Sequence, residues 1–495
     1  MIMYRSTRGG GVYKDSSEAI IKGIAEDNGL YVPERIPALP FEIKNMKDKP
    51  YGDFAYEIIK CFFTDYTDAE IRACVEAAYD DKFEKAEIAP VTKAGGMYFL
   101  ELYHGPTAAF KDMALTILPY LLTTAVKKKK DDTKICILTA TSGDTGKAAL
   151  AGFADVPGTE VMVFYPDKGV SEVQKRQMTT QEGENVHVFA INGNFDDAQT
   201  GVKKIFSDTA LSDKLLGMGY KLSSANSINV GRLIPQVAYY VYGYAKLARM
   251  GAVSDGECIN IVVPTGNFGN ILAAYYAKEM GLPVNKLICA SNENKVLTDF
   301  INTGRYDINR EFYLTNSPSM DILISSNLER LLFHLSGENP AEVRGLMESL
   351  SKTKSYEVSG VIKNGLAAFY GGFADTAQTI KAIGDVYKNH GYLMDTHTAV
   401  ATKVYEDYRN STKDETPALI ASTASAYKFA ESAAAAIGLF EEKDGFAYVK
   451  SLHNATGVKV PKALEGLEEK SIRFTGVLNI DEMMGAVENS LAKRP

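Results

Sequence analysis

The chain has 495 residues, of which 45% are hydrophobic and 23% are charged, and its formal net charge is −8. This composition is typical of a globular protein with room for about three domains. The acidic balance argues against a nucleic-acid partner, because proteins that bind nucleic acid usually present a broad basic surface. No apolar run is long enough to span a membrane, so we expect neither nucleic acid nor membrane as a partner.

Cysteine usage indicates the compartment. Five cysteines are scattered along the chain without any CxxC spacing. An odd and widely spaced set is typical of a reducing compartment, where disulfides are rare. The first residues lack the apolar core of a signal peptide, so we expect a cytoplasmic protein. The histidines share no ligand spacing, and no metal site is predicted.

The first ninety or so residues are predicted to be mainly helical. Asp15 and Glu18 have the spacing of a capping box, which starts a helix by satisfying its free backbone N–H groups. Apolar residues at Ala19, Ile20 and Ile24 then form one helical face. Two further helices are expected over residues 51–63 and 68–79.

The pattern changes after Pro90 and the pair Gly95-Gly96, which mark a boundary. Short apolar runs now alternate with helical patterns, which predicts a parallel sheet covered by helices on both faces. Buried strands are expected over residues 134–140, 160–165, 186–191, 259–263 and 286–290. We therefore predict three parts: a helical part over 1–94, an α/β core over 95–442, and a small α+β segment over 443–495.

Lys111 lies in the segment with the clearest chemistry, which reads Tyr-His-Gly-Pro-Thr-Ala-Ala-Phe-Lys-Asp-Met-Ala over residues 103–114. It follows a Gly-Pro turn, neighbours Phe110 and begins an apolar helical run. A lysine that its surroundings keep neutral is suited to Schiff-base chemistry. The alternative is a surface lysine that opens a helix, since charged side chains are mostly exposed.

A second candidate is the loop Thr-Ser-Gly-Asp-Thr-Gly at residues 141–146, between a predicted strand and a helix predicted over 147–153. Hydroxyls and free N–H groups at a helix start suit the carboxylate of a small substrate. Ser142 is a weak candidate for a nucleophile, because no GxSxG motif is present and no histidine is near in the sequence.

The third candidate is the loop Pro-Thr-Gly-Asn-Phe-Gly-Asn at residues 264–270, before a helix predicted over 271–280. A glycine-rich turn points backbone N–H groups at a ligand, and the helix dipole adds partial positive charge. The loop lacks the lysine of a P-loop and the spacing of a dinucleotide fingerprint. It is therefore a candidate phosphate cradle, with an ordinary tight turn as the alternative.

Together these segments resemble the fold-type-II pyridoxal-phosphate enzymes, and within them the threonine synthase family. Further segments resemble the family's sequence motifs and follow in the same order along the chain: residues 3–9, 30–33, 226–232, 395–399, 423–424, 428–429 and 458–461. The chain departs from the family where Thr396 replaces a proline and where Ser425-Ala426 replaces His-Pro. The resemblance implies an α/β core of two lobes, like the tryptophan synthase β chain, with the cofactor between the lobes.

The resemblance also implies roles for single residues. Lys111 would be the catalytic residue and form a Schiff base with pyridoxal 5'-phosphate. The cofactor phosphate would rest on Gly266, Asn267, Phe268, Gly269 and Asn270. Asp144 would lie near the cofactor's ring oxygen, and Thr423 would face the pyridine nitrogen, leaving it largely neutral and the ring a weaker electron sink. The substrate would contact Thr141, Ser142, Thr145, Asn229 and Arg232.

Three side chains have open alternatives. Arg232 is assigned to the substrate phosphate, because a guanidinium matches phosphate oxygens in a fork, and a structural salt bridge is the alternative. His104 is expected to support the lysine loop rather than act as an acid. His397, near a helix start, could approach the phosphate, and a helix-capping or buried role is the alternative.

The function that the resemblance implies is conversion of O-phospho-L-homoserine and water to L-threonine and phosphate, the last step of threonine biosynthesis. A small-molecule substrate and a monomer or homodimer are expected. One alternative is an eliminating relative that acts on phosphothreonine or phosphohomoserine and releases 2-oxobutyrate. Another is a binding or regulatory protein that kept the fold and lost the chemistry. The presence of Lys111, Asp144 and Thr423 together counts against the last.

Overall fold

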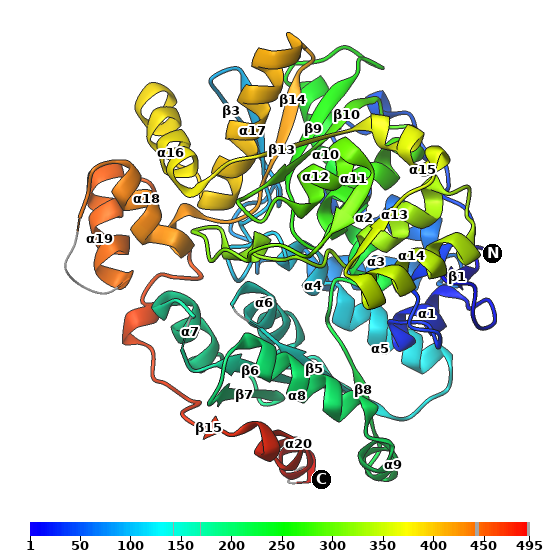
Figure 1. The fold of residues 1–495 in the computed structure, drawn as a ribbon. Helices are drawn as coiled ribbons and strands as arrows, with labels where there is room; N and C mark the ends of the chain where they lie inside the picture. Colours follow the sequence, from blue (N-terminus) through cyan, green and yellow to red (C-terminus); the bar gives the residue numbers. More distant parts are fainter. Residues whose placement is uncertain (142, 169, 441–444, 493–495) are drawn as a thin grey trace.

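Two sheets divide the chain into an upper and a lower lobe (Figure 1). The computed structural model describes all residues except 142, 169, 441–444 and 493–495. The upper sheet has six strands in the order β13-β10-β9-β14-β4-β3, all parallel apart from the antiparallel pair β3–β4. Its strands are β3 (Val91–Ala94), β4 (Met97–Glu101), β9 (Ile259–Pro264), β10 (Val284–Ser291), β13 (Phe369–Phe373) and β14 (Ala418–Ser422).

The lower sheet is entirely parallel and has the order β15-β7-β6-β5-β8. Every residue of β6 is buried, which explains why this strand appears in the sequence as a continuous apolar run. Its strands are β5 (Lys134–Ala140), β6 (Thr159–Pro166), β7 (Val186–Ile191), β8 (Tyr220–Ser223) and β15 (Val477–Leu478). Its helices are α6 (Asp144–Phe153), α7 (Glu172–Thr179), α8 (Phe195–Ser207) and α9 (Thr209–Gly217).

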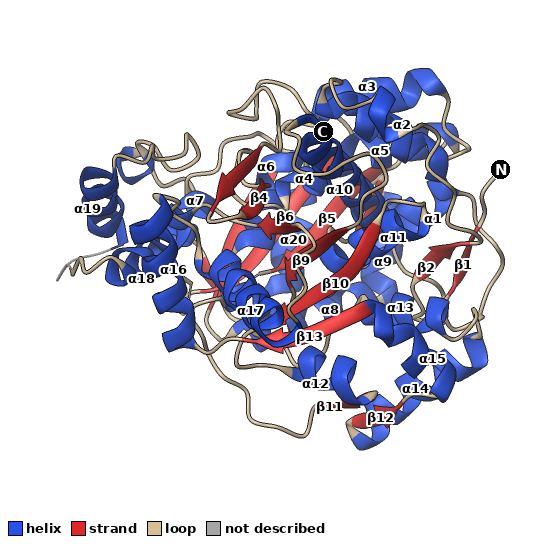
Figure 2. Ribbon diagram, turned by 90° about the horizontal axis from the view of Figure 1, so that it is seen from above, coloured by secondary structure: helices blue, strands red, loops and turns tan. Residues whose placement is uncertain are grey.

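Helices cover both faces of the upper sheet, as Figure 2 shows from above for α17. Alternate residues of β9 take part in different cores: Ile261 and Val263 pack with α10 and α11, whereas Val262 packs with α16 and α17. This alternation follows from the period of two along a strand. The helices are α10 (Val230–Arg249), α11 (Gly269–Glu279), α16 (Thr376–His390) and α17 (Thr396–Thr412). The expected two-lobed α/β architecture is therefore confirmed.

The remaining elements complete the upper lobe and its edge. The N-terminal part adds the antiparallel pair β1 (Tyr4–Ser6) and β2 (Tyr31–Pro33), with α1 (Ser16–Lys22) between them in the chain, and then α2 (Tyr51–Phe62) and α3 (Asp68–Ala78). After it come α4 (Asp112–Leu115) and α5 (Leu118–Lys128). Later in the chain are α12 (Val296–Thr303), β11 (Arg305–Asp307), α13 (Leu328–Leu335), α14 (Pro340–Thr353), β12 (Ser355–Glu357) and α15 (Gly360–Gly365).

The predicted N-terminal helices are present, with one error. The Asp15 side chain caps α1 by accepting from the Glu18 N–H at 2.9 Å. Ile24 does not belong to the apolar face, because α1 ends before Gly23, where the backbone turns to a φ of 70°. Ile24 is 38% exposed as a result. The sequence pattern also did not reveal the short antiparallel pair β1–β2.

Gly95 and Gly96 form the turn of the β3–β4 hairpin, so the boundary placed at 94/95 falls inside a pair of bonded strands. The boundary at 442/443 lies outside the described residues. Beyond it, α19 (Gly445–Thr456) packs on α18 (Ala430–Ala436), and the chain then descends to β15 and α20 (Met483–Ala492) on the lower lobe (Figure 1). The C-terminal segment therefore contacts both lobes, and the three-part division stays a prediction.

Two properties of the described residues bear on the expected environment. All five cysteines are free. Among the helices that the structure describes, none combines the length and the apolarity needed to cross a bilayer.

Candidate active site

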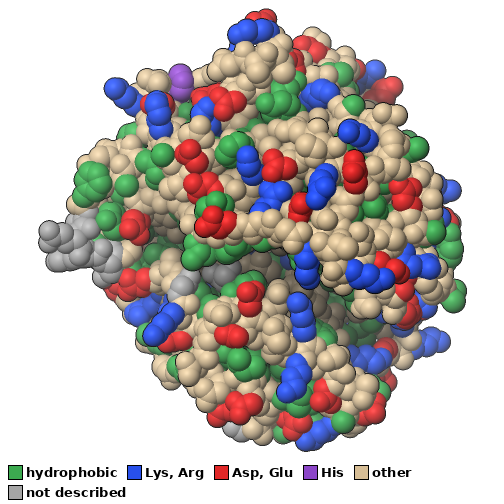
Figure 3. All heavy atoms as spheres, in the orientation of Figure 1, with side chains coloured by type: hydrophobic (Ala, Val, Ile, Leu, Met, Phe, Trp, Pro, Cys, Tyr) green, Lys and Arg blue, Asp and Glu red, His purple; other side chains and the backbone are tan. Residues whose placement is uncertain are grey.

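The candidate site lies where the carboxyl ends of strands from both lobes face each other. β5 leads into the 141–146 loop, β9 into the 264–270 loop, and β14 into Thr423. Ligands of open parallel sheets typically bind at such strand ends. Figure 3 shows the surface hollowed between the two lobes.

Lys111 begins α4 and its amine is largely withdrawn from solvent. Nζ lies 3.7 Å from Asp144 Oδ2 and donates to Ser319 Oγ at 3.4 Å, and the side chain is 12% exposed. Burial lowers the pKa of Lys111, the positive charges of Lys428 and Arg232 lower it further, and Asp144 opposes them. The net shift favours a neutral amine, which Schiff-base chemistry requires. The alternative of an exposed surface lysine is therefore wrong.

The turn before Lys111 is fixed from three sides. Thr107 donates through its N–H to Asp112 Oδ2 at 2.8 Å and through its hydroxyl to Oδ1 at 2.6 Å. Its carbonyl accepts from Lys428 Nζ at 2.9 Å. Phe110 N–H donates to the Thr423 carbonyl at 2.7 Å. These bonds hold the lysine segment against the chain that follows β14.

Asp144 starts α6 and holds an ionised carboxylate inside the protein. Oδ1 accepts from Lys428 Nζ at 2.6 Å and from Gln174 Nε2 at 3.0 Å. Burial on its own would raise the pKa of Asp144, but Lys428 and Lys111 together hold that pKa well below its usual range. A buried carboxylate normally needs such partners to stay charged.

The 264–270 loop has the geometry of an anion cradle. Phe268 takes a φ of 65°, so the chain turns sharply and α11 begins at Gly269, two residues earlier than predicted. A Cβ on Gly266 would lie 2.6 Å from the Ser319 carbonyl oxygen, so only glycine fits. The carbonyls of Gly266 and Asn267 accept bonds from Ser325 and Asn327 on the protein side.

At the end of this loop, donors of Asn270 and of the first turn of α11 have no protein partner among the described residues. No side chain caps the first turn of α11 in the described structure, which leaves its backbone N–H groups for a ligand. Asn270 Nδ2 is buried and has no partner among the described residues, whereas Oδ1 accepts from Tyr239 and Tyr240 at 2.5 Å each. Orphan donors beside a helix start fit the phosphate of a cofactor.

The 141–146 loop is shaped by Thr141. Its hydroxyl accepts from the N–H groups of Gly143 and Gly146, each at 3.0 Å, and donates to the Gly143 carbonyl at 3.1 Å. Thr141 therefore holds the loop in shape instead of offering a free hydroxyl. Thr145 lies half-buried on the first turn of α6, which begins three residues earlier than predicted. Ser142 lies outside the described residues.

The two residues assigned to the substrate at α10 differ. Asn229 caps the helix through Oδ1, which accepts from Gly231 N–H at 2.9 Å, and donates through Nδ2 to the Ile20 carbonyl at 2.9 Å. Both ends of this amide are occupied, which favours a structural role, and the substrate assignment of Asn229 stays a prediction. Arg232 has no ion pair among the described residues, and its Nη1 donates to the Ala225 carbonyl at 2.7 Å. Its Nε is buried without a partner, and burial lowers its pKa to about 10.

Both histidines near the site have structural partners. His104 Nε2 lies 2.7 Å from Glu101 Oε2, in a buried pair beneath the lysine segment. His397 Nδ1 lies 2.8 Å from Asp395 Oδ2, and Nε2 accepts from the Ser319 N–H at 3.2 Å. Asp395, not the histidine, caps α17.

Thr423 is held by its backbone at the mouth of the site. Its N–H donates to Thr398 Oγ1 at 3.2 Å. Where the chain departs from the expected His-Pro, Ser425 N–H donates to the Ala108 carbonyl at 3.1 Å and its hydroxyl accepts from Tyr427 N–H. The substituted segment therefore still docks on the lysine segment.

Three further side chains at the site were not predicted: Ser319, Gln174 and Lys428. The segment around Ser319 combines Pro318 with polar neighbours, which indicates a turn but no specific role. Lys428 is the one charged residue among small and apolar neighbours from Thr423 to Ala430, and this isolation was the available signal.

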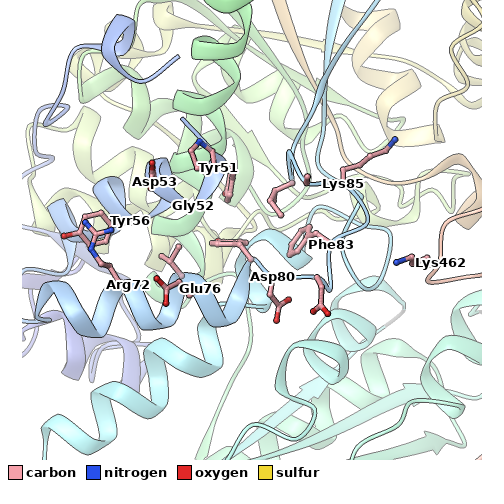
Figure 4. A pocket seen from close by; sticks show the side chains of 16 residues that line it. Tyr51, Gly52, Asp53, Tyr56, Arg72, Glu76, Asp80, Phe83, Lys85 and Lys462 are labelled. Atoms are coloured by element: carbon pink, nitrogen blue, oxygen red, sulfur yellow. The ribbon is translucent and has the colours of Figure 1, made fainter. Parts of the chain in front are cut away.

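A separate pocket of about 600 Å³ lies against α2 and α3 (Figure 4). Tyr51, Tyr56, Arg72 and Lys462 help to line it, and its rim mixes acidic and basic side chains. It shares no described residue with the candidate site. Within the described residues, no group of three or more His, Cys, Asp or Glu side chains is placed to hold a metal ion.

Family comparisons cover nearly the whole chain. Residues 3–79 match the family described as threonine synthase N terminus. Residues 87–423 match the pyridoxal-phosphate dependent enzymes, and residues 398–488 match the threonine synthase C-terminal family. Dependence on this cofactor agrees with the buried amine and the orphan donors described above.

Individual relatives agree with these matches. The human protein named Threonine synthase-like 1 is 39% identical over 438 residues, which are 86% of this chain and 58% of that protein, so the chain spans less than two thirds of its length. The threonine synthase of Schizosaccharomyces pombe is 34% identical over 526 residues, covering 99% of both chains. The solved structure of the pyridoxal-phosphate-bound threonine synthase from Brucella melitensis has a TM-score of 0.87 and 34% identity, covering 100% of this chain and 99% of that one.

Proposed function

This chain belongs to the threonine synthase family, and from that premise we propose that it releases phosphate from O-phospho-L-homoserine and adds water to give L-threonine. The family's enzymes are lyases that depend on pyridoxal phosphate. The observation that carries the proposal is Lys111, a buried amine 3.7 Å from Asp144 at the junction of the two lobes.

The cofactor fits the side chains that surround Lys111. Lys111 Nζ would bind it covalently, and Asn270 Nδ2 with the N–H groups of residues 266–270 would bind its phosphate. Asp144 and Thr423 would contact its ring. When bound, pyridoxal phosphate withdraws electrons from the substrate's Cα and so makes the neighbouring protons labile.

Lys111 would carry the protons in this reaction. Once freed by the substrate amine, its Nζ would take the proton from Cα and release it, then take one from Cβ as the phosphate leaves from Cγ, and pass that second proton to Cγ. Nζ can accept a proton only when it is neutral, and burial with two neighbouring cations supports that state by lowering its pKa. Cα would regain a proton after water has given its hydroxyl to Cβ and its other hydrogen to the released phosphate.

Substrate binding is assigned to groups on both lobes. Arg232 would bind the substrate phosphate, because its Nε is buried without a partner and a guanidinium binds phosphate oxygens in a fork. Thr145 and Ser142 would bind the carboxylate at the start of α6, on the loop that Thr141 shapes. Closing of the lobes would keep water out until the last step.

A second candidate is elimination to 2-oxobutyrate, because the same lysine and the same phosphate-binding groups would serve it, and the two reactions differ only in the fate of the late intermediate. The purified chain, supplied with pyridoxal phosphate and O-phospho-L-homoserine, tests the choice. Threonine equal to the phosphate released supports the proposal. 2-Oxobutyrate as the main product contradicts it and supports the second candidate.

We also propose a cytoplasmic, monomeric or homodimeric enzyme with no nucleic-acid partner. The scattered free cysteines support a reducing compartment. Sedimentation of the purified chain tests the oligomeric state.

A further inference from the structure

Lys428 is a second buried lysine at the site, and it lies between the lobes. It belongs to the 3-10 helix η4 (Ala426–Phe429), which follows β14 of the upper sheet, and its side chain is 0% exposed. Its Nζ bonds to the Thr107 carbonyl in the upper lobe and to Asp144 Oδ1 in the lower lobe. One ammonium group therefore ties α6 to the turn that precedes Lys111.

The carboxylate of Asp144 is shared unequally between the two lysines. Oδ1 lies 2.6 Å from Lys428 Nζ, within hydrogen-bond distance, and Gln174 donates to the same oxygen at 3.0 Å. Oδ2 lies 3.7 Å from Lys111 Nζ, which is too long for a hydrogen bond. A buried lysine bonded directly to a carboxylate would stay charged, and a charged amine is not a nucleophile.

We propose that Lys428 is a positioning residue that holds Asp144 in an ion pair across the two lobes and so keeps this carboxylate beyond hydrogen-bond distance of the Lys111 amine. The proposal rests on the proposed function only in assigning the cofactor to Lys111. The charged groups that act on Lys111 are Asp144 on α6, Lys428 on η4, Arg232 on α10 and Asp112 on α4. Lys428 acts among them both directly and through Asp144.

Loss of the Lys428 charge should change the pKa of Lys111 in a defined direction. Asp144 would turn its negative charge to Lys111, and the repulsion between the two ammonium groups would vanish. Both changes raise the pKa of Lys111, so a higher pH is needed to make its amine neutral. Lys428→Gln removes the charge and keeps a donor for the Thr107 carbonyl, and Lys428→Arg keeps the charge.

The experiment measures how fast added pyridoxal phosphate joins the cofactor-free, full-length chain as the pH is varied. The rise of near-visible absorbance gives the rate, and no substrate is present. Lys428→Gln should move the midpoint of the pH profile upward by about one unit, the usual size for one nearby charge. Lys428→Arg should leave the midpoint at the value of the unaltered chain. A folded Lys428→Gln protein whose profile superimposes on that of the unaltered chain would overturn the proposal.

Two more variants separate the route of the effect. Asp144→Asn should move the midpoint downward, and adding Lys428→Gln in that background should shift it much less than in the unaltered chain. An equal upward shift in both backgrounds overturns the role of Asp144. Lys147→Met is the matched control, because Lys147 is a buried lysine on α6 whose amine donates to Gln181. If Lys428→Gln does not fold, Lys428→Met is measured in its place, both in the unaltered chain and in the Asp144→Asn variant.

Absence of threonine in the product assay would refute the proposed function and leave this binding profile intact. If the pH profiles of the unaltered chain and the Lys428 variants coincide, the role of Lys428 is refuted, even in an active threonine synthase.

Discussion

His397 Nε2 accepts the Ser319 backbone N–H at 3.2 Å and thereby fixes the hydroxyl that lies 3.4 Å from Lys111 Nζ. The same turn places the Ser319 carbonyl against Gly266 of the 264–270 loop. One histidine thus holds a turn that contacts both the reactive amine and the proposed phosphate cradle. Both of its ring nitrogens have protein partners, Nδ1 in Asp395 and Nε2 in the Ser319 N–H.

His397→Leu should therefore weaken cofactor binding more than it slows the bound enzyme. Removing the acceptor leaves the half-buried Ser319 N–H without its partner, which costs about 1–2 kcal/mol. We expect roughly a tenfold or greater rise in the dissociation constant of pyridoxal phosphate, measured by titration of the cofactor absorbance. His397→Gln keeps an acceptor and should lose less. Equal affinity in the Leu variant and the unaltered chain would refute this role.

Gly266→Ala should disturb the phosphate cradle by steric contact alone. The added Cβ would meet the Ser319 carbonyl at 2.6 Å, and backbone cannot yield as a side chain can. Overpacking of this kind costs about 1–3 kcal/mol, so cofactor affinity should fall by about tenfold or more. Gly345→Ala on α14 is the control, since nothing lies within 4 Å of that position. If Gly266→Ala and Gly345→Ala bind pyridoxal phosphate with the same affinity, the close approach of residue 266 to the Ser319 carbonyl is unimportant.

Arg232→Gln should raise the KM for O-phospho-L-homoserine and leave the cofactor absorbance unchanged. The variant loses the charge and the forked donors that would bind the substrate phosphate, and charge-assisted bonds contribute about 1.5–3 kcal/mol each. Steady-state kinetics should show a KM about tenfold higher or more. A normal KM with loss of cofactor would instead assign Arg232 to the cofactor.

Acid should destabilise the fold through His334 on α13. Burial and the nearby charges of Arg330 and Arg5 lower the pKa of His334 to about 3. Since the folded pKa lies below the unfolded value of about 6.5, the stabilising contribution is complete above that value and is lost as the pH falls. Unfolding free energy should drop by about 2 kcal/mol between pH 7 and pH 5 from this residue.

His334→Gln provides the comparison, because the amide can still accept the bond that Tyr276 OH makes to His334 Nε2 at 2.9 Å. Urea denaturation at both pH values should show a smaller loss for this variant. The same loss in both proteins would mean that other groups cause the acid sensitivity.

The strands could be predicted because both faces of a parallel sheet are buried, which leaves apolar runs such as those in β5 and β6. The β3–β4 hairpin was not recognised, because a Gly-Gly pair such as Gly95-Gly96 can indicate either a tight turn or a domain boundary. Both helix starts were placed too late, since the last loop residues form the first turn once Gly143 and Phe268 adopt unusual backbone angles.

For the site, local motifs could identify Lys111, Asp144 and the 264–270 loop, because each depends on residues that are adjacent in sequence. The capping role of Asn229 and the ion pair of Lys428 depend on contacts between distant segments. No periodicity or spacing records such contacts. The sequence therefore supplied candidates, and packing decided which of them meet.

Covalent mapping of the cofactor tests the central claim most directly, because Lys147 on α6 and Lys428 on η4 also carry amines near Asp144 and could compete with Lys111. The full-length protein loaded with pyridoxal phosphate would be reduced with borohydride, digested and analysed by mass spectrometry. The account predicts a pyridoxyl group on Lys111 alone. A pyridoxyl group on Lys147 or Lys428, or on no lysine, would contradict it.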